Sequence, residues 1–224
     1  MTPIIVALDF AEKKTLLALV DQLDPTQCRL KIGKEVFTRF GPELVRELQN
    51  KGFEIFLDLK FHDIPNTVVK ALQSAADLGV WMVNVHALGG IKMMEQSAKV
   101  MESYKTLLIA VTILTSTSDH DLALLGLPKS DEMVMRLAQL AAQSKMDGVV
   151  CSALEAKAIK QATGSDFLTV TPGIRLLTDR KDDQTRIMTP KAAIDNSADY
   201  LVIGRPITQS QQPADTLNNI ISTL

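Results

Sequence analysis

The chain has 224 residues, of which 46% are apolar and 22% charged, so it suits one α/β domain with a sizeable core. Its 24 basic and 26 acidic residues give a formal net charge of −2, which argues against a general nucleic-acid-binding surface. No apolar run is long enough to span a membrane, and the N-terminus lacks the basic region of a signal peptide. The two cysteines, Cys28 and Cys151, lie far apart without a metal-type spacing, so we expect a cytoplasmic protein with reduced cysteines.

Short aliphatic runs alternate with amphipathic stretches of helix length along the chain. The runs predict strands over residues 4–10, 28–33, 53–59, 81–87, 107–114, 148–152, 167–174 and 199–205. Helices are expected over residues 12–23, 34–50, 66–78, a Met-rich stretch ending near 104, 131–145 after a longer loop, an Ala- and Lys-rich stretch after 152, and 213–224.

Eight strand–helix units is the number that closes a parallel barrel, and strands buried on both faces are expected to be continuous aliphatic runs. Because no linker or composition shift divides the sequence, we predict a (β/α)8 TIM barrel forming a single domain over residues 1–224. A doubly wound open sheet is the alternative, but no G-x-G-x-x-G follows the first strand.

The most informative stretch is FEIFLDLKFHDIPNT, residues 53–67, a strand that runs into a loop before Pro65. Side chains two positions apart on a strand share a face, so Asp58 and Lys60 are expected side by side, with Asp63 just beyond. Burying unpaired charge is costly, and this triplet therefore favours a functional role. A solvated strand end with a surface ion pair is the alternative.

In a barrel of this class the active site lies at the carboxyl ends of the strands. The residues predicted there are Asp9, Lys31, Asp58, Lys60, Asp63, His86, Thr115, Pro172, Arg175, Gly204 and Arg205. Several ionisable groups at one end of a barrel favour a functional site. Singly, Asp9 could instead cap the next helix, and His86 could be a core histidine.

Gly204 and Arg205 follow the eighth strand, where many barrels bind phosphate. Glycine lets a backbone N–H approach an anion closely, and arginine offers a two-pronged donor; Arg175 could supply a second one. The alternative is an ordinary strand-to-helix turn with an exposed arginine. The long polar stretch between Arg175 and Pro190 is interpreted as a lid with Gln184 reaching a ligand, or alternatively as a solvated loop.

Five segments together carry a family resemblance: ALDF, KIGKEVF, DLKFHDIPNT, TPGIR and IGRPI, in this order over essentially the whole chain. The sequence resembles the orotidine 5′-phosphate decarboxylases of the bacterial type. That resemblance implies a homodimeric TIM barrel without metal or organic cofactor. The implied reaction converts orotidine 5′-monophosphate (OMP) to uridine 5′-monophosphate (UMP), the last step of pyrimidine nucleotide synthesis.

The resemblance also implies roles for individual residues. The charged network at the reacting carbon would consist of Lys31, Asp58, Lys60 and Asp63, with Asp58 also binding substrate. Asp63 and Thr67 would enter the neighbouring subunit's site. Ribose hydroxyls would be held by Asp9 and Lys31, and the pyrimidine would lie near Thr115 and Pro172. Phosphate would be bound by Gln184, Gly204 and Arg205, with Arg175 beside them. No role is implied for His62 or His86.

Loss of CO2 from C6 of the pyrimidine leaves a carbanion in the ring plane, which the π system cannot delocalise. Without a cofactor, preorganised charge must stabilise it. Lys60 is the predicted group, because an ammonium can stabilise the carbanion and then protonate the same carbon. Asp58 and Asp63 are expected to keep this lysine charged and in position.

Two alternative functions stay open. A Mg²⁺-dependent sugar-phosphate decarboxylase or aldolase of the same superfamily shares D-x-K-x-x-D. Those relatives carry a metal-binding Glu where this chain has Lys31, and an ammonium cannot ligate a cation. The other alternative is a barrel that binds a phosphorylated ligand without catalysis, which the complete set of charged site residues disfavours.

Overall fold

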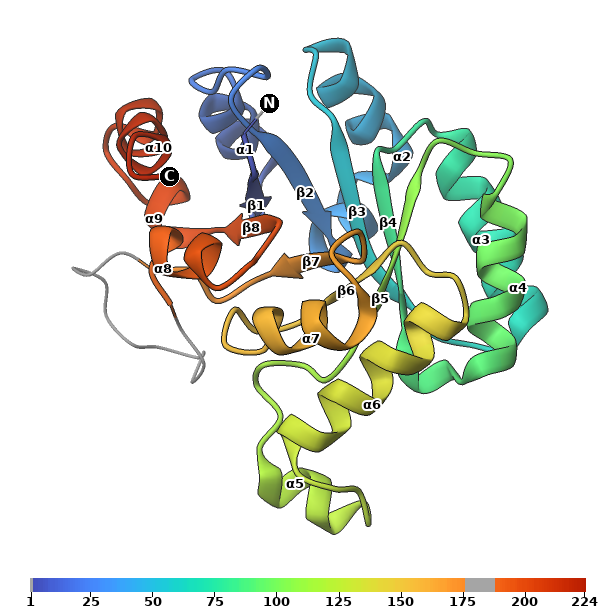
Figure 1. Cartoon of the computed structure of the whole chain (residues 1–224). Helices are drawn as coiled ribbons and strands as arrows, with labels where there is room; N and C mark the ends of the chain where they lie inside the picture. The colour runs from blue at the N-terminus through green and yellow to red at the C-terminus, as the bar shows by residue number, and fades with distance from the viewer. Residues whose placement is uncertain (1, 176–187) are drawn as a thin grey trace.

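Eight parallel strands close into a barrel in chain order, and the last strand pairs with the first (Figure 1). The computed structural model describes residues 2–175 and 188–224. The strands are β1 (Ile4–Leu8), β2 (Arg29–Gly33), β3 (Ile55–Phe61), β4 (Met82–His86), β5 (Leu107–Val111), β6 (Gly148–Val150), β7 (Leu168–Thr171) and β8 (Tyr200–Ile203). The predicted (β/α)8 barrel is confirmed, and the open-sheet alternative is wrong.

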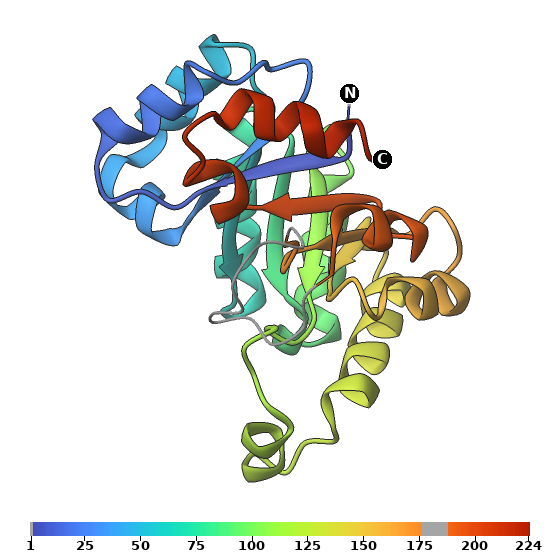
Figure 2. The same cartoon turned by 90° about the vertical axis from the view of Figure 1, so that its left-hand side faces the viewer.

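Helices lie around the outside of this barrel (Figures 1 and 2). The longer ones are α1 (Lys13–Val20), α2 (Lys34–Asn50), α3 (Pro65–Asp77), α4 (Ile91–Met101), α6 (Ser130–Gln143), α7 (Ala156–Thr163) and α10 (Pro213–Ile221). Shorter ones are η1 (Ala87–Gly89), α5 (Asp119–Leu124), α8 (Pro190–Asp195) and α9 (Arg205–Thr208). Across residues 2–175 and 188–224, none of them combines the length and apolar character needed to cross a membrane.

The stretch between β5 and α6 differs from its prediction as a loop, because it contains α5. A capping box between Ser118 and Asp121 satisfies backbone donors at the start of this helix. Both views show α5 projecting away from the barrel (Figures 1 and 2).

The strands are buried on both faces because alternate side chains point outward to the helices and inward to the barrel. On β1, Ile4, Val6 and Leu8 belong to the outer core shared with the helices. The inner core is formed by Ile5, Ala7, Phe56, Met82, Ile109, Val170 and Val202. Two positions further along their strands, this inward row becomes polar or glycine: Asp9 after Ala7, Asp58 after Phe56, Asn84 after Met82, and Gly204 after Val202. Strand alternation therefore gathers the polar set at the carboxyl end.

The amino end of the barrel is filled by a different cluster. The Arg29 guanidinium lies 4.2 Å from the ring centroid of Trp81 and 5.3 Å from that of Tyr200. Its Nε donates a 2.8 Å hydrogen bond to Glu54. A cation stacked on two aromatic rings and paired with a carboxylate therefore packs at this end.

Candidate active site

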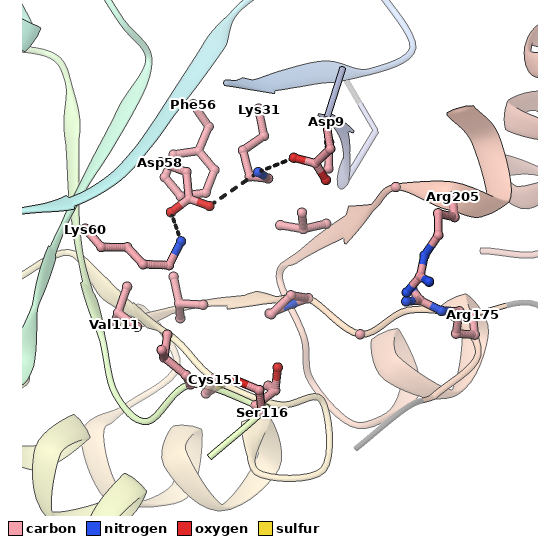
Figure 3. Close-up of a pocket in the computed structure, with 18 of the residues that line it drawn as sticks. Asp9, Lys31, Phe56, Asp58, Lys60, Val111, Ser116, Cys151, Arg175 and Arg205 are labelled. Carbon is pink, nitrogen blue, oxygen red and sulfur yellow. Dashed lines mark hydrogen bonds and ion pairs between the residues drawn. The ribbon is translucent and has the colours of Figure 1, made fainter. Parts of the chain in front are cut away.

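A cavity of about 590 Å³ lies at the carboxyl ends of the strands (Figure 3). Its lining includes most of the residues predicted from the sequence, namely Asp9, Lys31, Asp58, Lys60, Thr115, Pro172, Arg175, Gly204 and Arg205. These residues come from six different strand ends, so the barrel brings together positions far apart in the sequence.

Acidic and basic side chains alternate along one wall of the cavity (Figure 3). Lys31 Nζ lies 3.6 Å from Asp9 Oδ1 and 3.4 Å from Asp58 Oδ2. Lys60 Nζ donates a 2.5 Å hydrogen bond to Asp58 Oδ1. Lys31 and Asp58 are only 8% and 9% exposed, so this part of the row is held out of bulk water.

Asp58 is ionised in this environment. Burial is the largest influence on its pKa and opposes ionisation. The charges of Lys31 and Lys60, with hydrogen bonds from Lys60 and Asn84, outweigh burial and lower the pKa below 3.8. At neutral pH the wall therefore carries a fixed negative charge between two ammonium groups.

Lys60 meets Asp58 as predicted, but regular strand alternation is not the whole reason. The ladder pairs Leu57 with Val83 and Phe61 with Val85, so three β3 residues stand opposite the single residue between those two on β4. Lys60 has a φ of 51°, in the left-handed region. A bulge of this kind redirects a side chain, and here the ammonium points to Asp58.

Asn84 is the residue between Val83 and Val85, and sequence reasoning missed it. Its side chain is fully buried, with Nδ2 donating to Asp58 Oδ1 at 2.7 Å and Oδ1 accepting from the Lys60 backbone N–H at 2.7 Å. The available signal was an amide inside the aliphatic run WMVNVHA. Sequence reasoning also missed Ser116, Cys151 and Gln209, which line the cavity.

Two arginines lie across the cavity from Lys60 (Figure 3). Arg175 is 8% exposed, and its Nη1 donates to the Ile174 carbonyl at 2.9 Å. Arg205 extends toward Arg175 (Figure 3). Gly204 precedes α9 with a φ of −106°, so its lack of a side chain matters for close approach to the backbone and not for strain.

Asp63 and Thr67 are exposed, and neither is among the described residues that line the cavity. The Asp63 carboxylate accepts a 2.6 Å hydrogen bond from the Ile64 backbone N–H. The third member of D-x-K-x-x-D therefore lies away from the Asp58–Lys60 pair within one chain. Gln184 lies outside the described residues.

The structure also decides whether Asp9 is a helix cap and whether His86 is a core histidine. Asp9 does not cap the following helix, since Glu12 precedes α1 and Asp9 faces Lys31. His86 is half-buried at the end of β4 and is no fully buried core histidine. Its ring stacks on His62, with centroids 5.5 Å apart. Burial, followed by the charges of His62, Lys60 and Lys34, lowers the pKa of His86 from 6.5 to about 4.

A family model described as "Orotidine 5'-phosphate decarboxylase / HUMPS family" matches residues 2–220. The chain belongs to this family. Two curated orotidine 5′-phosphate decarboxylases illustrate the similarity. The one from Saccharophagus degradans is 57% identical over 99% of this chain and 94% of the relative. The one from Haemophilus influenzae is 55% identical over 97% of this chain and 96% of the relative.

Solved structures agree with this family assignment. The orotidine 5′-phosphate decarboxylase from Lactobacillus acidophilus is 37% identical, has a TM-score of 0.89 and covers 100% of this chain and 99% of its own. An uncharacterized conserved protein from Geobacillus kaustophilus is 38% identical with a TM-score of 0.87, and the match covers 99% of both chains. The family resemblance carried by the five sequence segments is confirmed.

In this member of the orotidine 5′-phosphate decarboxylase / HUMPS family, the two sides of the cavity carry different chemical groups. One wall presents the alternating charges of Asp9, Lys31, Asp58 and Lys60, and the other side presents two guanidinium groups. Guanidinium groups suit a phosphate, and an ammonium suits a carbon on which negative charge develops. Among the described residues, no three His, Cys, Asp or Glu side chains group in a way that could hold a metal ion.

Proposed function

We propose that the chain decarboxylates OMP to UMP. The observation that carries this proposal is the Lys60 ammonium, hydrogen-bonded to buried Asp58 in a cavity that has Arg175 and Arg205 on its far side. Family membership and the names of the curated relatives support the same reaction.

The substrate is expected to lie across the cavity. Its phosphate would contact Arg175, Arg205 and the backbone at Gly204, and its ribose hydroxyls would contact Asp9 and Lys31. This orientation would place the pyrimidine near Thr115 and Pro172 and bring C6 to Lys60. Phosphate binding far from C6 supplies binding energy that can align the reacting carbon with the ammonium.

Lys60 performs the chemical step in this proposal. The bond between C6 and the carboxylate breaks, its electron pair stays on C6, and CO2 departs. The ammonium stabilises the carbanion and then transfers a proton to C6, which gives UMP. Asp58 holds the Lys60 ammonium in position through a 2.5 Å hydrogen bond, and its negative charge would also face the substrate carboxylate.

The reaction is proposed to need neither metal nor organic cofactor. Lys31 places an ammonium between Asp9 and Asp58, 3.6 and 3.4 Å from their carboxylate oxygens, where a divalent cation would meet repulsion. A Mg²⁺-dependent sugar-phosphate decarboxylase or aldolase of the same superfamily is the alternative function.

We also propose a homodimer in which Asp63 and Thr67 complete the neighbouring subunit's site. Both residues are exposed, and Ile64 beside them is 67% exposed. The His62–His86 stack joins this loop to the segment that presents Leu88 and Ile91, which are 43% and 46% exposed. Exposed apolar side chains gathered on neighbouring segments are typical of a protein–protein contact.

A cytoplasmic location belongs to the same proposal. Cys28 and Cys151 are both buried, as expected of small apolar residues in a reducing compartment.

A direct assay tests the reaction. OMP added to the protein should lose pyrimidine absorbance as UMP forms, at the same rate with and without EDTA. A reaction that starts only after Mg²⁺ is added would favour the sugar-phosphate enzyme. Unchanged absorbance at high protein concentration would favour a barrel that only binds phosphorylated ligands.

A further inference from the structure

Asn84 is a fully buried amide between two valines of β4, and the reaction proposed above assigns it no role. Its neighbours on β4 are Val83 and Val85, and its partner on β5 is Ile109. Burying an amide is unfavourable unless its polar atoms are hydrogen-bonded. Its contacts therefore indicate why an amide stands at this position.

Both ends of the Asn84 amide are used, and only one orientation satisfies them. The Lys60 backbone N–H can only donate, so it requires Oδ1, at 2.7 Å. The ionised Asp58 carboxylate can only accept, so it requires Nδ2, also at 2.7 Å. One side chain thus binds the main chain of Lys60 and the carboxylate that Lys60 itself contacts.

The β3 bulge explains the need for this bridge. Three residues of β3 stand opposite Asn84, so the Lys60 N–H has a side-chain oxygen as its partner in place of a ladder carbonyl. Lys60 also holds a φ of 51°, a conformation that a residue with a side chain keeps only where its surroundings impose it. Without the Asn84 hydrogen bonds, a regular backbone conformation of β3 would compete with the bulged conformation.

We infer that Asn84 is a positioning residue that fixes the left-handed backbone of Lys60 and the carboxylate of Asp58, so that the Lys60 ammonium is held at the reacting carbon. The inference about catalysis rests on the proposed decarboxylation. The inference about geometry does not, because it concerns only Asn84, Asp58 and Lys60.

The first test removes both hydrogen bonds while keeping the side-chain size. Asn84→Leu should lower kcat about 100-fold, the effect expected of a misplaced catalytic group, while UMP still binds. Thr106→Val is the matched control, because it removes a buried 2.7 Å hydrogen bond to the Val80 carbonyl at the amino end of the barrel. The control should lose stability and keep kcat. Equal kcat in wild type and Asn84→Leu would overturn the inference.

The second test uses a variant that can restore the bridge. In Asn84→Asp, an ionised carboxylate would repel Asp58, whereas the protonated carboxyl would donate to Asp58 and still accept from the Lys60 N–H. Asp58, Lys60 and, through Asp58, Lys31 are charged groups around this position, and His86 follows on the same strand. The ratio of variant kcat to wild-type kcat should therefore rise as the pH falls. A ratio that is constant with pH would contradict the positioning role.

A crystal structure of Asn84→Leu tests the inference about geometry separately from the inference about catalysis. The geometry is supported if Lys60 leaves the left-handed region or its Nζ moves away from Asp58, and it is overturned if both stay in place. Wild-type protein that fails to turn over OMP would instead remove the proposed function and leave this structural result standing. If Asn84→Leu does not fold, the pH dependence of Asn84→Asp decides the inference alone.

Discussion

The Lys60 ammonium donates a 2.5 Å hydrogen bond to the carboxylate of Asp58, its neighbour two positions earlier on β3. A surface pair of this kind contributes little to stability. This pair instead lines a cavity, and a second ammonium, from Lys31, lies 3.4 Å from the same carboxylate. Charged groups concentrated around a cavity are more typical of a functional site than of interactions that stabilise the fold.

Lys60→Ala should abolish turnover and leave UMP binding largely intact. The ammonium is the only group proposed to stabilise and protonate the carbanion. Loss of a stabilising charge lowers kcat by about 100- to 1,000-fold, and loss of the general acid lowers kcat further. Single-turnover kinetics and UMP titration measure the two effects. Lys157→Ala, which removes an exposed lysine on α7, is the control and should behave as wild type. Near-normal turnover of Lys60→Ala would exclude the proposed mechanism.

Arg205→Ala should lower kcat/KM for OMP about 10- to 100-fold, mainly through KM, because it removes a charge-assisted hydrogen bond to phosphate. The control is Arg136→Ala on α6, whose guanidinium pairs with Glu132 on an exposed helix face. Steady-state kinetics of both variants give the comparison. An unchanged KM for Arg205→Ala would place the phosphate elsewhere.

Mixing two inactive variants should restore activity if subunits share their sites. Lys60→Ala lacks the proton donor of its own site, and Asp63→Asn lacks the residue proposed to enter its partner's site. After the subunits are exchanged, a mixed dimer has one intact site, so an equal mixture should recover about one quarter of wild-type activity. Sedimentation shows whether the protein is a dimer, and native mass spectrometry with one isotope-labelled variant shows whether mixed dimers have formed. No recovery in a verified mixed dimer would show that Asp63 acts within its own chain or not at all.

Acid should destabilise the protein partly through His86. Its pKa is about 4 in the folded chain against 6.5 for an ordinary histidine, so the unfolded chain binds more protons between these values. The contribution of His86 to the free energy of unfolding should therefore be complete above pH 6.5 and decrease as the pH drops toward 4. His86→Gln should flatten this fall in urea titrations across that range. His120→Gln, at an exposed position on α5, should retain the wild-type slope.

Gly148→Ala should destabilise the barrel by about 1–3 kcal/mol or more, as expected of overpacking in a rigid core. A Cβ at this position would lie 2.2 Å from the Leu168 carbonyl oxygen on β7, and backbone cannot move aside as a flexible side chain can. Gly204→Ala is the matched control, because its Cβ would lie 3.6 Å from Ala7 Cβ, an ordinary contact. Urea unfolding should show a loss of stability for the first variant alone.

The fold could be predicted from the sequence because barrel strands are buried on both faces and so form continuous aliphatic runs. Most charged site residues could be predicted for a related reason, since polar side chains directly after such runs must lie at one end of the barrel. The helix α5 was missed because it is only six residues long.

Asn84 and the bulge at Lys60 could not be predicted in the same way. Both depend on the register between β3 and β4, which is a property of the assembled sheet and leaves no local pattern. Sequence spacing alone suggested that Asp58 and Lys60 share a face, and it gave no sign that a neighbouring strand holds them there. The placement of Asp63 likewise depends on a second chain in our proposal.

The Arg29 cluster with Trp81 and Tyr200 packs at the amino end of the barrel, and the cavity lies at the carboxyl end. For the proposed reaction, we expect the nucleotide that enters and both products that leave to use the carboxyl end. In the proposed orientation, the two arginines hold the phosphate while carbon dioxide forms beside Lys60. The order of product release would then depend on how tightly these arginines hold the nucleotide.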